Sequence, residues 1–324
     1  MPNQTFSSQC SLLQTHFGEL LASVAEIEAA ITNFSRNPQA KTKKEIEEKF
    51  APLEERFEAK VEVYENAVRE LLKKWYPGIL LGEKVEFTDE GRVIIRGDLN
   101  LSSRVQGGYF CSVIQEIHGA LQTARTTHSL KGLEYIKNEL LISKEVFGDF
   151  VATDLKVVGQ IEPNNTPGQK LRFTVLDLSG LVSAKFIFLQ EADVVELRIP
   201  ELRECKFLRI GNVKKPFVLK KLRETHALEV HSDSSVELTV LSVVEQHFFV
   251  DAIHLSAPRL RKIGTTANLP SVDTVKKFVQ AFPVLEEIST DARVANSVVA
   301  EFLRDTKRSR VRCPKVYVMP DQPD

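Results

Sequence analysis

The chain has 324 residues, a formal net charge of −1 at pH 7, 43% apolar residues and 27% charged residues. This composition excludes a disordered chain, and the near balance of charges gives no global electrostatic case for nucleic acid. The N-terminus shows no secretory signal, and no apolar run approaches the roughly 18 residues that a membrane span needs. The widely spaced Cys10, Cys111, Cys205 and Cys313 argue against a zinc knuckle or a disulfide framework, so we expect a cytoplasmic protein.

Residues 1–78 are predicted to form an antiparallel helical hairpin of coiled-coil type. Apolar residues in its first helix alternate in steps of four and three, and a similar seam runs along the second helix. The seams consist of Leu13, Phe17, Leu20, Val24, Ile27, Ile31 and Phe34, and of Ile46, Phe50, Leu53, Phe57, Val61, Tyr64, Val68, Leu71 and Trp75. Asn37-Pro38 and Pro77-Gly78 end the helices, and Pro52 either starts the second helix or kinks it.

Residues 79–296 are predicted to form a β-solenoid, because apolar anchors recur at intervals of about 21 residues. The anchors are Ile114, Leu133, Leu155, Leu181, Leu202, Leu222, Leu241, Leu260 and Leu285. An apolar or small residue follows each anchor by three positions, as at Ile117, Ile136, Val158, Ala184, Cys205, Thr225, Val244, Ile263 and Ile288. Runs such as 195–199 and 227–230 alternate with period two, which is typical of half-buried strands.

The two ends of the solenoid are predicted to differ from its middle. Extended segments over 85–95 form a hairpin that leads into the first coil. Nine or ten coils at about 4.8 Å would match the length of a helix of about 30 residues, so the helical hairpin would lie along the solenoid or cap its first coil. Apolar residues follow helical spacing over 271–282, and residues 297–324 are expected to hold a C-terminal capping helix and a tail. The fold class is therefore α+β.

Three units share a Pro-x-Leu motif, over 200–205, 258–263 and 283–288. The middle unit continues as Ile-Gly-Thr-Thr-Ala and is preceded by Ile-His-Leu. That run resembles the short surface-antigen class of bacterial leucine-rich repeats, and the resemblance covers about residues 93–296. It implies a leucine-rich-repeat-like β-solenoid with a binding surface and without catalytic residues. The asparagine column of the common leucine-rich class is nearly absent, so a different β-helix stays open.

The position after the anchor is basic in three coils, at Arg203, Arg223 and Arg261, and Lys221 and Lys262 lie beside it in the sequence. Stacked coils would align these side chains along one edge, where they could hold phosphates or an acidic protein. Interleaved glutamates would neutralise such a column. Polyanion or nucleic-acid binding through this edge and the basic C-terminal tail is therefore the first alternative, and nucleic acid is not the partner that we expect.

Phe249 is a second candidate for a contact residue. Period-two alternation in His247-Phe248-Phe249-Val250 buries Phe248 and Val250 and points Phe249 outward. An exposed aromatic side chain on a flat strand surface is a suitable anchor for a protein partner. The other interpretation is that a neighbouring loop covers it.

No G-x-S-x-G, Walker, H-E-x-x-H or G-x-G-x-x-G motif occurs, so we expect neither an enzyme nor a cofactor. Stacked coils could bring His226 beside His247, but no further metal ligand follows the same periodicity. Asp177, Glu196 and Glu237 do not recur in adjacent coils, which leaves a carbohydrate-active β-helix enzyme as the second alternative. The preferred hypothesis is a non-enzymatic scaffold that recognises a protein through its strand surface, with the hairpin as an element for self-association.

Overall fold

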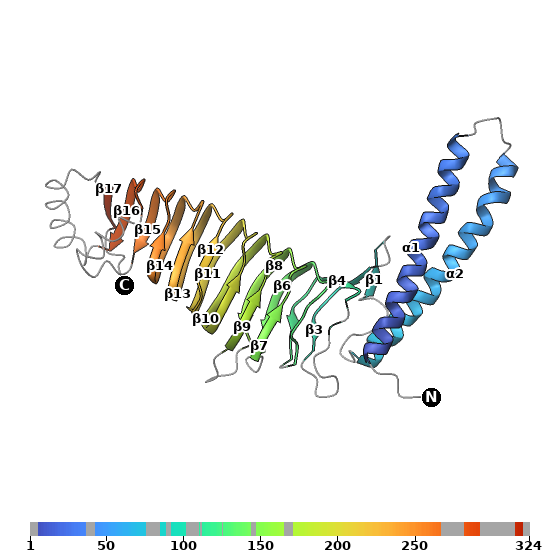
Figure 1. Ribbon diagram of the computed structural model, residues 1–324, viewed down its shortest axis with the longest axis horizontal. Helices are drawn as coiled ribbons and strands as arrows, with labels where there is room; N and C mark the ends of the chain where they lie inside the picture. The colour runs from blue at the N-terminus through green and yellow to red at the C-terminus, as the bar shows by residue number, and fades with distance from the viewer. Residues whose placement is uncertain are drawn as a thin grey trace.

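The computed structural model describes residues 6–36, 43–75, 85–88, 92–101, 110, 112–124, 126–143, 147–164, 171–266, 282–291 and 315–319. Two long helices lie at one end of a β-solenoid, whose strands follow one another along the chain toward the other end (Figure 1). The α+β architecture expected from the sequence, a helical hairpin followed by a solenoid with coils of about 21 residues, is confirmed. Among the described helices, none has a segment long and apolar enough to cross a membrane.

Among the described elements, the two helices come first and all the strands follow. They are α1 (Phe6–Arg36), α2 (Lys43–Trp75), β1 (Val85–Phe87), β2 (Val93–Ile95), β3 (Leu99–Asn100), β4 (Ile114–Ile117), β5 (Leu121–Gln122), β6 (Tyr135–Ile142), β7 (Phe147–Val151), β8 (Val157–Pro163), β9 (Leu171–Asp177), β10 (Ser183–Arg198), β11 (Glu204–Val213), β12 (Phe217–Leu219), β13 (Glu224–Leu238), β14 (Val243–Ser256), β15 (Lys262–Thr266), β16 (Glu287–Asp291) and β17 (Lys315–Met319). Apart from the antiparallel pair β1–β2, all the paired strands are parallel.

Two ring contacts show that the helices run antiparallel. The first half of α1 meets the second half of α2, and the end of α1 meets the start of α2. The rings of Phe17 and Tyr64 have centroids 5.9 Å apart, and those of Phe34 and Phe50 are also 5.9 Å apart. Pro52 lies inside α2 and does not start it. The helix begins earlier, and the carbonyl oxygen of Pro52 accepts a hydrogen bond from the side chain of a residue one turn later.

The seam predicted along α1 is only partly buried. Leu20 is 5% exposed, whereas Val24 and Ile31 are 37% and 51% exposed. α2 lies against the flank of α1 that carries Ser23, whose Oγ accepts a 2.6 Å hydrogen bond from Nζ of Lys60. A single partner helix covers only one flank of an apolar stripe. The outer half of the seam therefore lies in solvent, contrary to the prediction.

The hairpin caps the first coil and does not lie along the solenoid (Figure 1). Tyr64 of α2 contacts Phe87 of β1 with ring centroids 6.2 Å apart, and the guanidinium of Arg69 lies over the same ring at 5.3 Å. On α1, Nε2 of Gln14 donates a 3.3 Å hydrogen bond to Oγ of Ser112. Buried side chains of both helices and of the first coils belong to one continuous hydrophobic core. The apolar end of the solenoid is thus covered, as terminal units of repeat arrays require.

Six of the nine anchors, Leu133, Leu155, Leu181, Leu202, Leu260 and Leu285, end a β-turn at a corner of their coil. The amide of Leu181 donates to the carbonyl oxygen three residues earlier at 3.0 Å, and Leu202 and Leu260 make the equivalent bond at 3.4 and 3.2 Å. All nine anchors predicted from the sequence are buried, with exposed fractions of 3% or less: Ile114, Leu133, Leu155, Leu181, Leu202, Leu222, Leu241, Leu260 and Leu285. Residues about 21 positions apart therefore share one interior.

The strands that follow the anchors stack in parallel, and several of the pairs contain a register shift. In this first sheet, β10 pairs with β8 and β11, and β13 pairs with β11 and β14. After Leu189, where its register with β11 shifts, β10 pairs with β9 in place of β8, while Asp193 and Val194 still pair with β11. The long strands thus bend from one sheet into the next. The outward side chains of the first sheet form columns that run along the solenoid.

The C-terminal end differs from the expectation for residues 297–324. Lys315–Met319 form β17 and pair in parallel with β16, so that Ile288 lies opposite Val316 and Thr290 opposite Val318. We expected a tail there. Val316 and Val318 alternate with period two, as in the other strands of the solenoid, so the sequence does carry a signal for this strand. The helices expected over 271–282 and after 296 lie outside the described residues.

Candidate binding surface

Arg203, Arg223 and Arg261 lie in one column along the edge of the first sheet. The amide of Arg203 donates to Val182 of the preceding coil at 2.8 Å, and the amide of Arg261 donates to the carbonyl oxygen of Ser242 at 2.8 Å. Ser242 in turn donates to the carbonyl oxygen of Arg223 at 2.7 Å. The three arginine side chains are exposed, and none of them forms an ion pair with another described residue. They are available to a partner.

The two lysines beside this column link neighbouring coils. Nζ of Lys221 forms an ion pair with the carboxylate of Glu201 in the preceding coil, and this contact holds the pKa of that carboxyl below its usual range. Nζ of Lys262 lies 3.7 Å from Oε2 of Glu287 in the following coil. The structure therefore separates the lysines from the arginines, which the sequence had grouped together.

A hollow of about 490 Å³ opens beside the arginine column. Its lining contains three cations, Arg203, Lys206 and Arg223, and three carboxylates, Glu204, Glu224 and Glu245. Glu245 pairs with Nδ1 of His226, which also lines the hollow. Equal numbers of cations and carboxylates suit the mixed charges of a protein surface better than the continuous negative charge of a polyanion.

Stacked aromatic rings occupy the outward face of the first sheet next to this hollow. The ring centroid of Phe186 lies 5.6 Å from that of Phe188 and 5.3 Å from that of Phe207 in the next coil, in nearly parallel orientation. Nζ of Lys185 lies over the Phe186 ring at 5.3 Å, and the guanidinium of Arg209 lies over Phe188 at 5.8 Å. The rings are half-buried. We call these five residues the aromatic face.

Phe249 lies on the same side of the first sheet as the aromatic face. In β14 it pairs with Glu229, which pairs with Arg209 in the preceding coil. Its ring is half-buried, and its centroid lies 5.0 Å from that of His231. A side chain of the adjacent coil therefore covers part of Phe249, and no loop is needed to explain its burial. Phe248 is buried as predicted, at 2% exposed.

The sequence carries a signal for Phe186, Phe188 and Phe207, which are not among the predicted contact residues. Ile187 and Leu189 are buried in β10, so the phenylalanines that alternate with them point outward. The same alternation places Phe207 outward in β11. Their positions follow from period two, but their alignment across coils depends on the register, which a single strand does not reveal.

The candidate chemical groups are engaged in structural contacts. The guanidinium of Arg198 lies 3.1 Å from Oδ2 of Asp177 and 2.5 Å from Oε1 of Glu196. In the register of β13 and β14 it is Ala227, and not His226, that pairs with His247. Among the described residues, no group of His, Cys, Asp and Glu side chains could hold a metal ion. Cys205 is 4% exposed, and burial raises the pKa of its thiol to about 12, so it is not a reactive thiolate.

No family model matches this chain. No curated protein matches it, and no solved structure does either. The fold and the surface described above therefore carry the functional argument.

Proposed function

We propose that this protein is a non-enzymatic scaffold that recognises a protein partner through the aromatic face. The supporting observation is the stack of Phe186, Phe188 and Phe207, which remains half-buried on a flat parallel sheet with cations over two of its rings. Aromatic and arginine side chains are enriched among the residues that dominate protein interfaces. A rigid sheet also presents them without a large entropic cost of ordering on binding.

The charges around the face indicate the chemistry of the partner. Lys185 on the face and Lys206 and Arg203 beside it are exposed, and none of them forms an ion pair within the described part of the chain. We infer that the partner presents an apolar side chain flanked by carboxylates. Opposite charges at the rim would raise the association rate and fix the orientation.

Selection from a random peptide library displayed on phage tests this proposal. Enriched peptides should combine an aromatic or branched apolar residue with Asp or Glu, and Phe207→Ala should weaken their binding about tenfold or more. The matched control is Ile253→Ala, because Ile253 is 67% exposed and lies outside the aromatic face. Equal binding to wild type and Phe207→Ala, or weakening by the control alone, would refute the proposal.

Polyanion binding is the second candidate, because Arg203, Arg223 and Arg261 are aligned and unpaired among the described residues. Salt-sensitive retention on heparin should then fall when all three are replaced by Glu. The control is a triple variant in which Lys49, Arg56 and Lys73 on α2 are replaced by Glu. Similar losses in both triple variants, or no retention of wild type, would dismiss this candidate.

We further propose self-association of two copies through the outer half of α1. Leu21, Val24 and Ile31 are 51%, 37% and 51% exposed there. α1 also carries few charged side chains that could repel a second copy. The mass in solution should be that of a dimer, and Leu21→Glu with Ile31→Glu should return it to that of a monomer. A monomeric wild type would refute this proposal.

The finer classification is also a proposal. Kinship with the short bacterial leucine-rich repeats is supported by turns that end on a leucine after proline, as at Pro200 and Pro258. Residence in the reducing cytoplasm is supported by the spacing of the cysteines and by the buried thiol of Cys205.

A further inference from the structure

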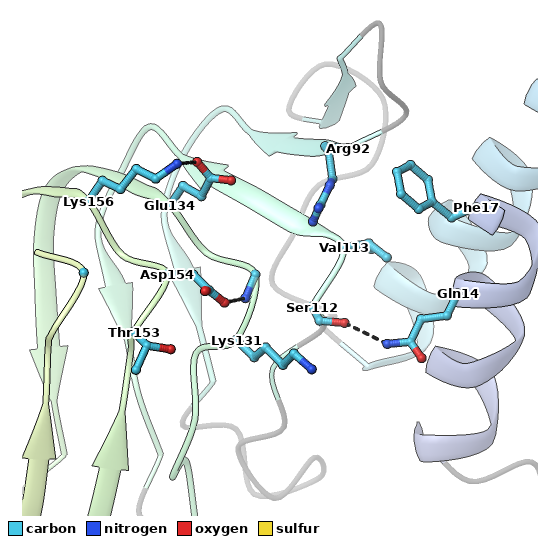
Figure 2. Close-up of a pocket in the computed structure, with 12 residues that line it drawn as sticks. Gln14, Phe17, Arg92, Ser112, Val113, Lys131, Glu134, Thr153, Asp154 and Lys156 are labelled. Carbon is cyan, nitrogen blue, oxygen red and sulfur yellow. Dashed lines mark hydrogen bonds and ion pairs between the residues drawn. The ribbon is translucent and has the colours of Figure 1, made fainter. Parts of the chain in front are cut away.

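A cavity of about 460 Å³ lies where the hairpin meets the first coils. Gln14 and Phe17 of α1 form one wall, and the turns around Lys131 and Asp154 form the other. Figure 2 shows the side chains of Arg92 and Lys131 extending into the space between these turns and α1. The cavity is thus built jointly by the two parts of the molecule.

The charges that line this cavity do not cancel. They are Arg92, Lys131 and Lys156 against Glu134 and Asp154, which leaves one positive charge. Lys156 donates to the Glu134 carboxylate and holds the pKa of that carboxyl below its usual range. Oδ2 of Asp154 accepts a 2.8 Å hydrogen bond from the amide of Gly132 in the preceding coil (Figure 2).

Neither of the two remaining cations forms an ion pair within the described residues, although the charge of Arg92 also lowers the pKa of Glu134. The guanidinium of Arg92 is half-buried and lies 5.4 Å from the ring centroid of Phe17, and Lys131 is exposed. The half-buried guanidinium has lost part of its hydration, and an anion bound between Arg92 and Lys131 would compensate for that loss. The site therefore favours an anionic guest.

The same wall offers apolar surface. The Phe17 ring and Val113 line the cavity beside the cations, and Val113 is 6% exposed. In the opposite wall, glycines let neighbouring turns pack closely against each other. A Cβ on Gly132 would lie 2.1 Å from the carbonyl oxygen of Ser112, so no larger residue fits at this turn without a backbone shift.

We propose that this cavity binds a small organic anion, a carboxylate or phosphate group attached to an apolar body. The anion lies between Arg92 and Lys131, and the apolar body packs on Phe17. Because α1 supplies one wall, the bound anion also strengthens the contact between the hairpin and the solenoid. This inference is independent of the aromatic face.

Titration of the full chain with phenyl phosphate and with phenylacetate, followed by calorimetry, tests the proposal and distinguishes the two anionic groups. At least one of them should bind, inorganic phosphate should bind more weakly, and phenylacetamide should not bind. Lys131→Gln should weaken binding about tenfold, since it removes one charge-assisted contact. Lys131 is the cleanest site for this change, because it is exposed and is not part of the hydrophobic core.

Two further variants separate loss of the site from loss of the fold. Lys137→Gln removes an exposed lysine outside the cavity and should leave the affinity unchanged. Glu134→Gln removes a negative charge from the lining and should tighten binding. Hydrogen exchange of the α1 amides near Gln14 should slow on addition of the ligand. Binding of neither anion, equal binding of phenylacetamide, an unchanged affinity in Lys131→Gln, or unaltered exchange in α1 would each overturn the proposal.

Discussion

The outer half of the hairpin and the middle of the solenoid bury apolar side chains to very different extents. In α1, Leu21 and Ile31 are both 51% exposed, whereas Leu202, Leu222 and Leu241 are fully buried. The hairpin has one helix to cover each apolar stripe, while every coil has a neighbour on both sides. Burial in this protein thus depends on the number of neighbours and not on the hydrophobicity of the segment.

The largest expected effect comes from comparing two Leu→Ala substitutions, one in each region. Leu202→Ala should lower the free energy of unfolding by about 2–5 kcal/mol, because it opens a cavity in the shared interior. In the monomer, measured at a protein concentration low enough to dissociate the proposed dimer, Leu21→Ala should change it by less than about 0.5 kcal/mol. Urea denaturation followed by circular dichroism measures both. Similar losses in the two variants would mean that the hairpin contributes to the core as much as the solenoid does.

Two Gly→Ala substitutions, one in each region, should change the stability of the protein in opposite directions. A Cβ on Gly180 would lie 1.9 Å from the carbonyl oxygen of Thr153 in the adjacent coil, whereas one on Gly18 would meet nothing within 4 Å. Gly180→Ala should therefore destabilise the protein by about 1–3 kcal/mol. Gly18→Ala should stabilise α1 by about 0.5–1 kcal/mol, since alanine has the higher helix propensity. Thermal unfolding that shifts in the same direction for both variants would contradict this account of the coil spacing.

The same contrast explains what the sequence could predict. The interior of the solenoid was predictable, because every coil repeats the same burial requirement and nine anchors report it independently. The exposure of Ile31 was not predictable, since a heptad seam does not tell which flank its partner covers. Period-two alternation could predict that the phenylalanines of the aromatic face point outward. It could not predict that Phe186 lies opposite Phe207 in the next coil, which makes the face continuous. The cavity beside Phe17 depends on how α1 docks, which no local pattern encodes.

The smallest expected effect concerns acid stability. Ion pairs in the solenoid link successive coils, as between Lys156 and Glu134, whereas pairs such as Arg69–Glu65 lie within one helix. The contact with Lys156 lowers the pKa of Glu134, so its contribution is present above the ordinary carboxyl pKa and is lost as the pH falls through the lowered value. Glu134→Gln should cost less than about 1 kcal/mol at pH 7. The difference from wild type should shrink as the pH falls through the lowered pKa of Glu134, and a larger difference in acid would contradict this sign.

The distance between labels placed on one column tests the stacking most directly. Spin labels at Lys156 and Arg261, with the native cysteines replaced by alanine, are separated by five coil steps through Val182, Arg203, Arg223 and Ser242. At about 4.8 Å per step their backbones should lie about 24 Å apart. Moving the first label from Lys156 to Val182 should shorten the measured distance by about 5 Å. A distance that does not change with the number of coils between the labels would contradict the parallel solenoid and remove the aligned surfaces on which the proposed function rests.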